Sequence, residues 1–154
     1  MKPRIGVSAC LLGETVRYDG SHRREPAVAD VLARRADLAP VCPEMEAGLG
    51  VPREPIAFSE DGERLAGTMS GVDVTDRLRA AAKTLCADLM KQGLDGFVFK
   101  SRSPSCGIKG VPRGNRGLFA RSLIDVFPGL PIADEEDLRD PSRLDEFWKN
   151  VSGR

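Results

Sequence analysis

Three cysteines of this chain occupy equivalent places, because each one directly follows or closely trails a segment predicted to be a strand. Cys10 follows the apolar run 5–9, Cys42 follows 38–41, and Cys106 lies in the loop after the apolar run 97–99. In an open parallel sheet the carboxyl ends of all strands share one edge, and ligands bind in the crevice at that edge. We therefore expect the three thiols to converge on one bound group, although they lie far apart in the sequence.

Three thiolates without a second cysteine or a carboxylate at close spacing indicate a soft metal centre, and an iron–sulfur cluster fits best. A four-iron cluster on three thiolates keeps one iron without a protein ligand, free to act as a Lewis acid. Two alternatives remain open from these residues, namely a cluster-based sensor and a zinc-stabilised binding module. His22, the only histidine, is predicted to lie in a solvated loop. Cys86 falls in the middle of a predicted helix and is expected to be a core residue.

Strand and helix signals alternate along the chain. Helices are predicted to start at Glu25-Pro26 and to run from Asp73 to about Gln92. A third helix is predicted to be capped by Asn115 and ended by Pro128, and a last one to start at Asp140-Pro141. A fourth strand is predicted at 130–133. Residues 43–72 are rich in glycine and proline and predict a long functional loop with a small hairpin around Asp61-Gly62. This order predicts an α/β chain with a mostly parallel, doubly wound, Rossmann-like sheet of about four strands and helices on both faces.

Size and charge limit the classes of function. A length of 154 residues fits a single domain spanning 1–154. The 23 basic and 23 acidic residues balance, so no nucleic-acid partner is expected, since such modules normally carry a basic excess. The short apolar start lacks the features of a secretory signal, and no run is long enough to span a membrane. Four cysteines without an export signal indicate a reducing compartment, which predicts a cytoplasmic protein. The sequence does not indicate an oligomeric state.

Four motif regions between residues 5 and 107 carry a family likeness. They are VSACLLG (7–13) with VRYDG (16–20), CPE (42–44) with residues 48–53, GVDVT (71–75) and KSRSPSCG (100–107). With these motifs the sequence resembles the thiouracil desulfidase family, formerly a domain-of-unknown-function family. The resemblance implies a [4Fe-4S] cluster ligated by the cysteines that match Cys10, Cys42 and Cys106. It also implies non-redox removal of sulfur from 2- or 4-thiouracil, a small thiopyrimidine, to give uracil and hydrogen sulfide.

Side chains beside the cysteine segments supply a hypothesis for this chemistry. Water at neutral pH is a weak nucleophile, so a positioned group must move protons while the substrate sulfur is bound at the open iron. Glu44 is the first candidate and Glu46 the reserve, with an ion pair to Arg53 as the structural alternative for Glu44. Ser101 is the second catalytic candidate.

Other residues of the motifs are predicted to bind the substrate or to stabilise an anionic centre. Tyr18 is expected to stack on or hydrogen-bond a pyrimidine, and nearby cations are expected to stabilise the thiolates and the cluster. The expected substrate-binding residues are Ser8, Tyr18, Lys100 and Ser103, and the expected cations are Arg17, Arg53 and Lys100.

Overall fold

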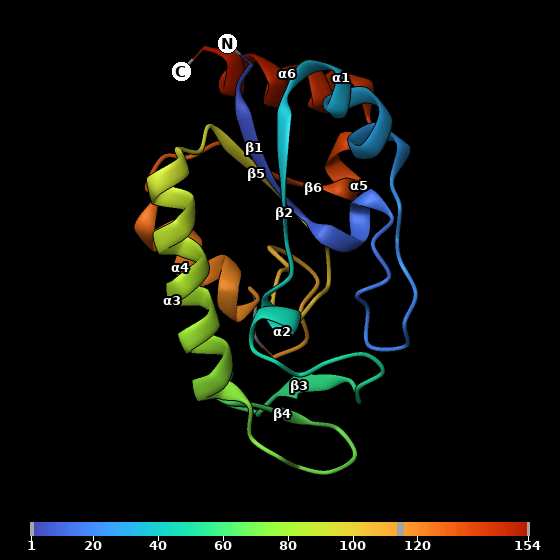
Figure 1. Cartoon of the computed structure of the whole chain (residues 1–154), viewed down its shortest axis with the longest axis vertical. Coiled ribbons are helices and arrows are strands. Elements are labelled where there is room, and N and C mark those ends of the chain that lie inside the picture. Colours follow the sequence, from blue (N-terminus) through green and yellow to red (C-terminus); the bar gives the residue numbers. More distant parts are fainter. Residues whose placement is uncertain (1, 114–115, 154) are drawn as a thin grey trace.

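Four parallel strands form the central sheet of this computed structural model, which describes residues 2–113 and 116–153 (Figure 1). The strand order is β2-β1-β5-β6. The chain runs outward from β1 to β2 and then returns to the other side of β1 with β5, so the direction of winding reverses between β1 and β5. The bounds are β1 (Arg4–Ser8), β2 (Asp37–Val41), β5 (Gly96–Phe99) and β6 (Ile132–Asp134).

Helices cover both faces of the sheet, which confirms the predicted doubly wound α/β class (Figure 1). The helices α3 and α4 pack on one face, and η2, α5 and α6 pack on the other. None of the helices in the described part of the chain is long and apolar enough to cross a membrane. The helical elements are η1 (Ala9–Leu12), η2 (Ala27–Leu32), α1 (Ala33–Arg35), α2 (Pro43–Glu46), α3 (Thr75–Gln92), α4 (Leu118–Val126), α5 (Glu135–Leu138) and α6 (Pro141–Ser152).

The inner strands are apolar on both faces because helices cover each of them. In β5, Phe97 and Phe99 face the core under α3 and α4, whereas Val98 faces the opposite core. The ring of Phe97 lies over Gly6 of β1, where an added Cβ atom would come within 2.4 Å of the ring. Glycine is therefore required at this position for the two central strands to pack. Cys86 is buried in the same core.

Three elements differ from the sequence prediction. The first helix begins as the π-helix η2, in which the Ala33 N–H donates to the Val28 carbonyl, before it continues as α1. The stretch 43–72 contains the predicted hairpin, formed by β3 (Ile56–Phe58) and β4 (Leu65–Gly67), but it also contains the short helix α2. A second short helix, α5, directly follows β6. Both short helices lie at the edge of the sheet where the three cysteines are found. The cap predicted at Asn115, ahead of α4, lies outside the described residues.

Candidate active site at the carboxyl edge of the sheet

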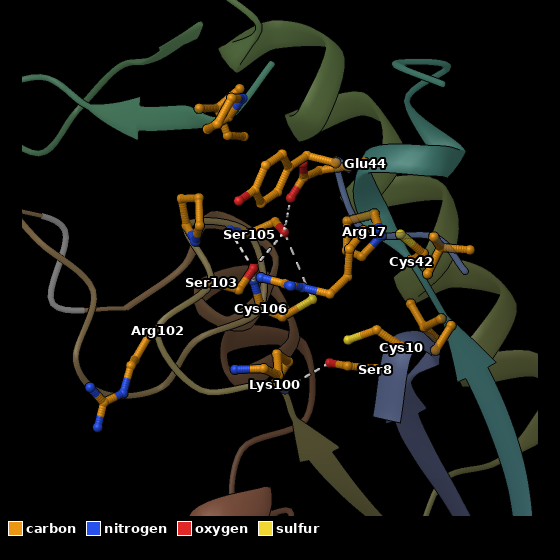
Figure 2. Close-up of a pocket in the computed structure, with 18 of the residues that line it drawn as sticks. Ser8, Cys10, Arg17, Cys42, Glu44, Lys100, Arg102, Ser103, Ser105 and Cys106 are labelled. Carbon is orange, nitrogen blue, oxygen red and sulfur yellow. Dashed lines mark hydrogen bonds between the residues drawn. The ribbon is translucent and has the colours of Figure 1, made fainter. Parts of the chain in front are cut away.

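A pocket of about 350 Å³ opens beyond the carboxyl ends of β1, β2 and β5, where the winding of the sheet reverses (Figure 2). This is the place at which open α/β sheets bind their ligands. All nine residues expected from the sequence to form the site line this pocket. They are Ser8, Cys10, Tyr18, Cys42, Glu44, Lys100, Ser101, Ser103 and Cys106. The reserve candidate Glu46 is not among the residues that line it.

Short turns after β1 and β2 place the first two thiols. Cys10 lies in the 3₁₀ turn η1, and its carbonyl accepts hydrogen bonds from Gly13 at 3.3 Å and Arg23 at 2.9 Å. Gly13 ends the turn at φ 93°, a backbone conformation that favours glycine. Cys42 occupies the N-cap position of α2, and Pro43 stands at the first helical position, where its missing N–H costs nothing. The two thiols thus leave neighbouring strands at the same edge.

The third thiol is held by the start of α4. The first N–H groups of a helix have no partner inside the helix, and here they bind the cysteine loop. The Leu118 N–H donates to the Pro104 carbonyl at 3.0 Å, and the Phe119 N–H donates to the Ser105 carbonyl at 2.9 Å. At Gly117 an added Cβ atom would lie 2.5 Å from the backbone of Ser105, so only glycine allows this approach. The loop that carries Cys106 is therefore fixed by a core helix.

Burial makes all three thiols poor acids. It raises the pKa of Cys10 to about 11, against the lowering effects of Lys100 and Arg17. Burial also raises the pKa of Cys106, which a hydroxyl hydrogen bond from Ser8 partly offsets. The pKa of Cys42 is raised by burial as well, and backbone hydrogen bonding from Met45 opposes this. These thiols are therefore expected to hold their protons at neutral pH in the metal-free protein, and any metal that they bind would have to displace those protons.

The donor set fits a metal cluster better than a single ion. A tetrahedral zinc with Zn–S bonds of about 2.3 Å would bring its sulfurs to about 3.8 Å from one another. Among residues 2–113 and 116–153, no three His, Cys, Asp or Glu side chains lie close enough to hold one metal ion. His22, the only possible imidazole ligand, lies outside the pocket, and its Nδ1 accepts the N–H of Arg24. Three soft donors spread around one cavity match an iron–sulfur cluster.

Glu44 is held in a defined pose at one wall of the pocket. The Arg53 Nε donates to Glu44 Oε1 at 2.9 Å, and both side chains are nearly buried. The other carboxylate oxygen, Oε2, accepts from the Ser105 hydroxyl at 2.8 Å. The Ser105 hydroxyl also lies 3.1 Å from that of Ser103. Glu44 thus forms the ion pair with Arg53 that was considered as an alternative to a catalytic role, and it also lines the pocket.

A second buried carboxylate, Glu135, organises the opposite wall and was not identified from the sequence. Its Oε1 accepts the Ser101 N–H at 2.7 Å, and its Oε2 accepts the Ser101 hydroxyl at 3.1 Å. The Lys100 ammonium lies 3.2 Å from the same Oε2. The Lys100 N–H donates to the Ser8 hydroxyl at 2.9 Å, which ties the ends of β5 and β1 together. The available signal was position, because Glu135 directly follows the fourth strand at the same edge.

Tyr18 and Arg17 lie in the loop after η1. The guanidinium of Arg17 lies 5.5 Å from the centroid of the Tyr18 ring and points into the pocket (Figure 2). Tyr18 is 38% exposed, so an aromatic face is available at the wall of the pocket. A flat ring of the size of a pyrimidine would find a stacking surface there.

Three comparisons with known proteins found similarity to a thiouracil desulfurase family, to one curated protein and to one solved structure. A family model described as 2-thiouracil desulfurase matches residues 5–135. The uncharacterized protein YbbK of Bacillus subtilis (strain 168) is 38% identical over 112 residues, which cover 67% of this chain and 72% of YbbK. A solved structure described as the [4Fe-4S]-dependent thiouracil desulfidase TudS superposes with a TM-score of 0.77 at 31% identity. The match covers 96% of this chain and 99% of the TudS chain.

Proposed function

The chain belongs to the 2-thiouracil desulfurase family, and we propose that it is a [4Fe-4S]-dependent enzyme that hydrolyses thiouracil to uracil and hydrogen sulfide without net redox change. Water supplies the oxygen that replaces sulfur on the ring carbon, and its two protons leave with the sulfide. The observation that carries the proposal is the convergence of three thiols on one pocket at the edge where the sheet reverses its winding. Cys10 and Cys106 are buried there, and Cys42 is partly buried.

Cys10, Cys42 and Cys106 are the proposed cluster ligands. When bound, a four-iron cluster with three thiolate ligands offers one iron as a soft Lewis acid, which prefers a thiocarbonyl sulfur to a carbonyl oxygen. Among the described residues no three His, Cys, Asp or Glu side chains, these thiols included, lie close enough together to hold a single metal ion. An iron without a protein ligand would also make the cluster sensitive to oxygen, so we propose that the enzyme works in the reducing cytoplasm.

Glu44 is the proposed proton-transfer residue. Its carboxylate lines the pocket, and the hydrogen bonds from Arg53 and Ser105 fix its orientation. A positioned base typically contributes about 10²–10⁴-fold to the rate of such a step. Ser101 is proposed to assist from the opposite wall as an acceptor, since its hydroxyl hydrogen is donated to Glu135.

The remaining pocket residues are proposed to bind the ring. Tyr18 offers an aromatic face, and Ser8, Ser103 and Lys100 offer polar groups at the wall. The chain carries equal numbers of basic and acidic residues, which favours a free thiopyrimidine over a nucleic acid as substrate.

The test is anaerobic purification, followed by measurement of iron, zinc and visible absorption, and then of sulfide and uracil formed from 2-thiouracil and from 4-thiouracil. We expect iron in the protein and sulfide in proportion to uracil. Glu44→Gln should lower the rate by about 10²–10⁴-fold, whereas Glu46→Gln, on the same short helix but outside the pocket, should retain it. Zinc without iron contradicts the proposed cofactor, and iron without sulfide release contradicts the proposed reaction.

A further inference from the structure

We propose that the Lys100–Glu135 pair selects the substrate by its carbonyl group, with Lys100 as the hydrogen-bond donor and Glu135 as the residue that positions it. This inference rests on the proposed function and specifies which thiopyrimidines the pocket accepts.

The contacts of the Lys100 ammonium leave one donor loosely held. One N–H is donated to the Ser101 carbonyl at 2.8 Å, and a second faces Glu135 Oε2 at 3.2 Å. The third has only a long contact of 3.4 Å to the Ser101 hydroxyl. Lys100 lines the pocket and its side chain is 19% exposed. A substrate oxygen can therefore replace the long contact without breaking the two shorter ones.

Glu135 is suited to position this donor because it is buried and all its hydrogen bonds point to the end of β5. Its side chain is only 4% exposed, and a buried carboxylate is tolerated only where it is paired and hydrogen-bonded. Both of its oxygens accept from Ser101, and one also binds Lys100. Lys100 thus presents to the pocket an ammonium that can donate but cannot accept.

The two thiouracils share the feature that such a donor would recognise. In both 2-thiouracil and 4-thiouracil the thiocarbonyl carbon is followed by a ring N–H and then by a carbonyl group. With the sulfur placed towards the thiols, both isomers present a carbonyl oxygen at the same relative position. In 2-thiocytosine an amino group replaces that carbonyl and the adjacent ring nitrogen carries no hydrogen, so at the carbonyl position a donor would meet a donor. A site built around one hydrogen bond discriminates strongly against a group that cannot make it.

The experiment compares cluster-loaded wild-type protein with Lys100→Gln, Glu135→Gln and the control Glu25→Gln. Glu25 is also a carboxylate of low exposure, paired at 2.8 Å with the exposed Arg139, and neither residue lines the pocket. Values of kcat and KM are measured for 2-thiouracil, 4-thiouracil and 2-thiocytosine. Binding of uracil and cytosine, which contain no sulfur to remove, is measured by calorimetry. Circular dichroism melts report whether each variant is folded, and the double variant Lys100→Gln/Glu135→Gln replaces Lys100→Gln if that one does not fold.

Wild-type protein should favour both thiouracils over 2-thiocytosine by at least about tenfold in kcat/KM, the effect of one hydrogen bond to a charged group. Lys100→Gln should narrow this ratio, because the amide oxygen of glutamine can accept from an amino group. Glu135→Gln should raise KM for thiouracil more than it lowers kcat, and Glu25→Gln should change neither KM nor the ratio.

Equal processing of 2-thiocytosine by the wild type, or an unchanged ratio in folded Lys100→Gln, overturns the inference while leaving the desulfidase activity in place. Absence of sulfide from both thiouracils instead removes the proposed function. In that case calorimetry still tests Lys100: its role stands if the preference for uracil over cytosine is present in the wild type and smaller in Lys100→Gln, and it falls otherwise.

Discussion

Replacing Arg53 by methionine should strongly destabilise the protein, because it leaves the carboxylate of Glu44 nearly buried without its cation. The Arg53 and Glu44 side chains are 8% and 12% exposed. Arg53 also donates to the Val16 and Gly50 carbonyls, each at 2.8 Å, so it joins three segments around the pocket. Breaking a buried ion pair from one side costs about 3–5 kcal/mol. The free energy of unfolding of a native domain is about 5–15 kcal/mol, so we expect Arg53→Met to fold with much reduced stability.

The assay is denaturant unfolding of the metal-free protein, followed by circular dichroism and by the fluorescence of Trp148, the only tryptophan. A double-mutant cycle with Glu44→Gln separates the charge from the packing. Adding Glu44→Gln to Arg53→Met removes the unpaired charge, so the double variant should be more stable than Arg53→Met alone. This recovery is a signature that a loss of packing would not produce.

The matched control is Arg24→Met, which removes the exposed ion pair with Asp30 and should move the unfolding midpoint far less. The reasoning fails if Arg53→Met is no more harmful than Arg24→Met. It also fails if the double variant is no more stable than Arg53→Met, because the buried charge would then not be the cause.

Two further predictions concern the thiols. Cys106→Ala should abolish iron binding after anaerobic reconstitution. Cys86→Ala should bind iron normally and lose about 0.5–3 kcal/mol of stability, as for an ordinary packing change. Iron analysis and denaturant unfolding check both variants, and loss of iron in Cys86→Ala would contradict the assignment of Cys86 to the core. The raised pKa of Cys10 predicts that the metal-free protein loses stability as pH rises from 9.0 to about 11, since the unfolded thiol releases its proton first. The free energy of unfolding, measured at several pH values in this range, should fall more steeply with pH for the wild type than for Cys10→Ala. The same pH dependence in both proteins would refute the prediction.

The order of long elements could be predicted from the sequence because each one carries its own local pattern. The apolar run at Phe97–Phe99 and the helical spacing before Gly93 depend on neighbouring residues only. The helices α2 and α5 were missed because four residues are too few to show a period. Their signals are caps, namely Pro43 at the first helical position and the capping box between Asp134 and Asp137. The π-helical turn of η2 has no such signal, since apolar spacing alone does not distinguish it from an α-helix.

The place of the site could be predicted more completely than its contacts. The rule that strand ends share an edge requires no knowledge of side-chain packing, and it places Cys10, Cys42 and Cys106 around the pocket where they are observed. Their role as ligands remains a prediction. Glu135 was overlooked because the rule was applied to three strands and not to the end of β6. The contact between Glu44 and Ser105 joins residues far apart in the chain, and no local pattern encodes it.

The pairing of charges around the pocket explains how a site rich in cations can suit an uncharged ring. Three of the four cations that line it are neutralised by carboxylates within ion-pair distance, namely Arg53 by Glu44, Lys100 by Glu135 and Arg102 by Glu136. Across the part of the chain that the structure describes, Arg17 has no such carboxylate partner, and it lowers the pKa of Cys10. A strong net positive field would draw anions into the pocket without favouring a neutral pyrimidine. Paired cations instead keep their directional N–H donors while their charge is cancelled, which leaves Arg17 as the cation most available to stabilise the thiolates of the proposed cluster ligands.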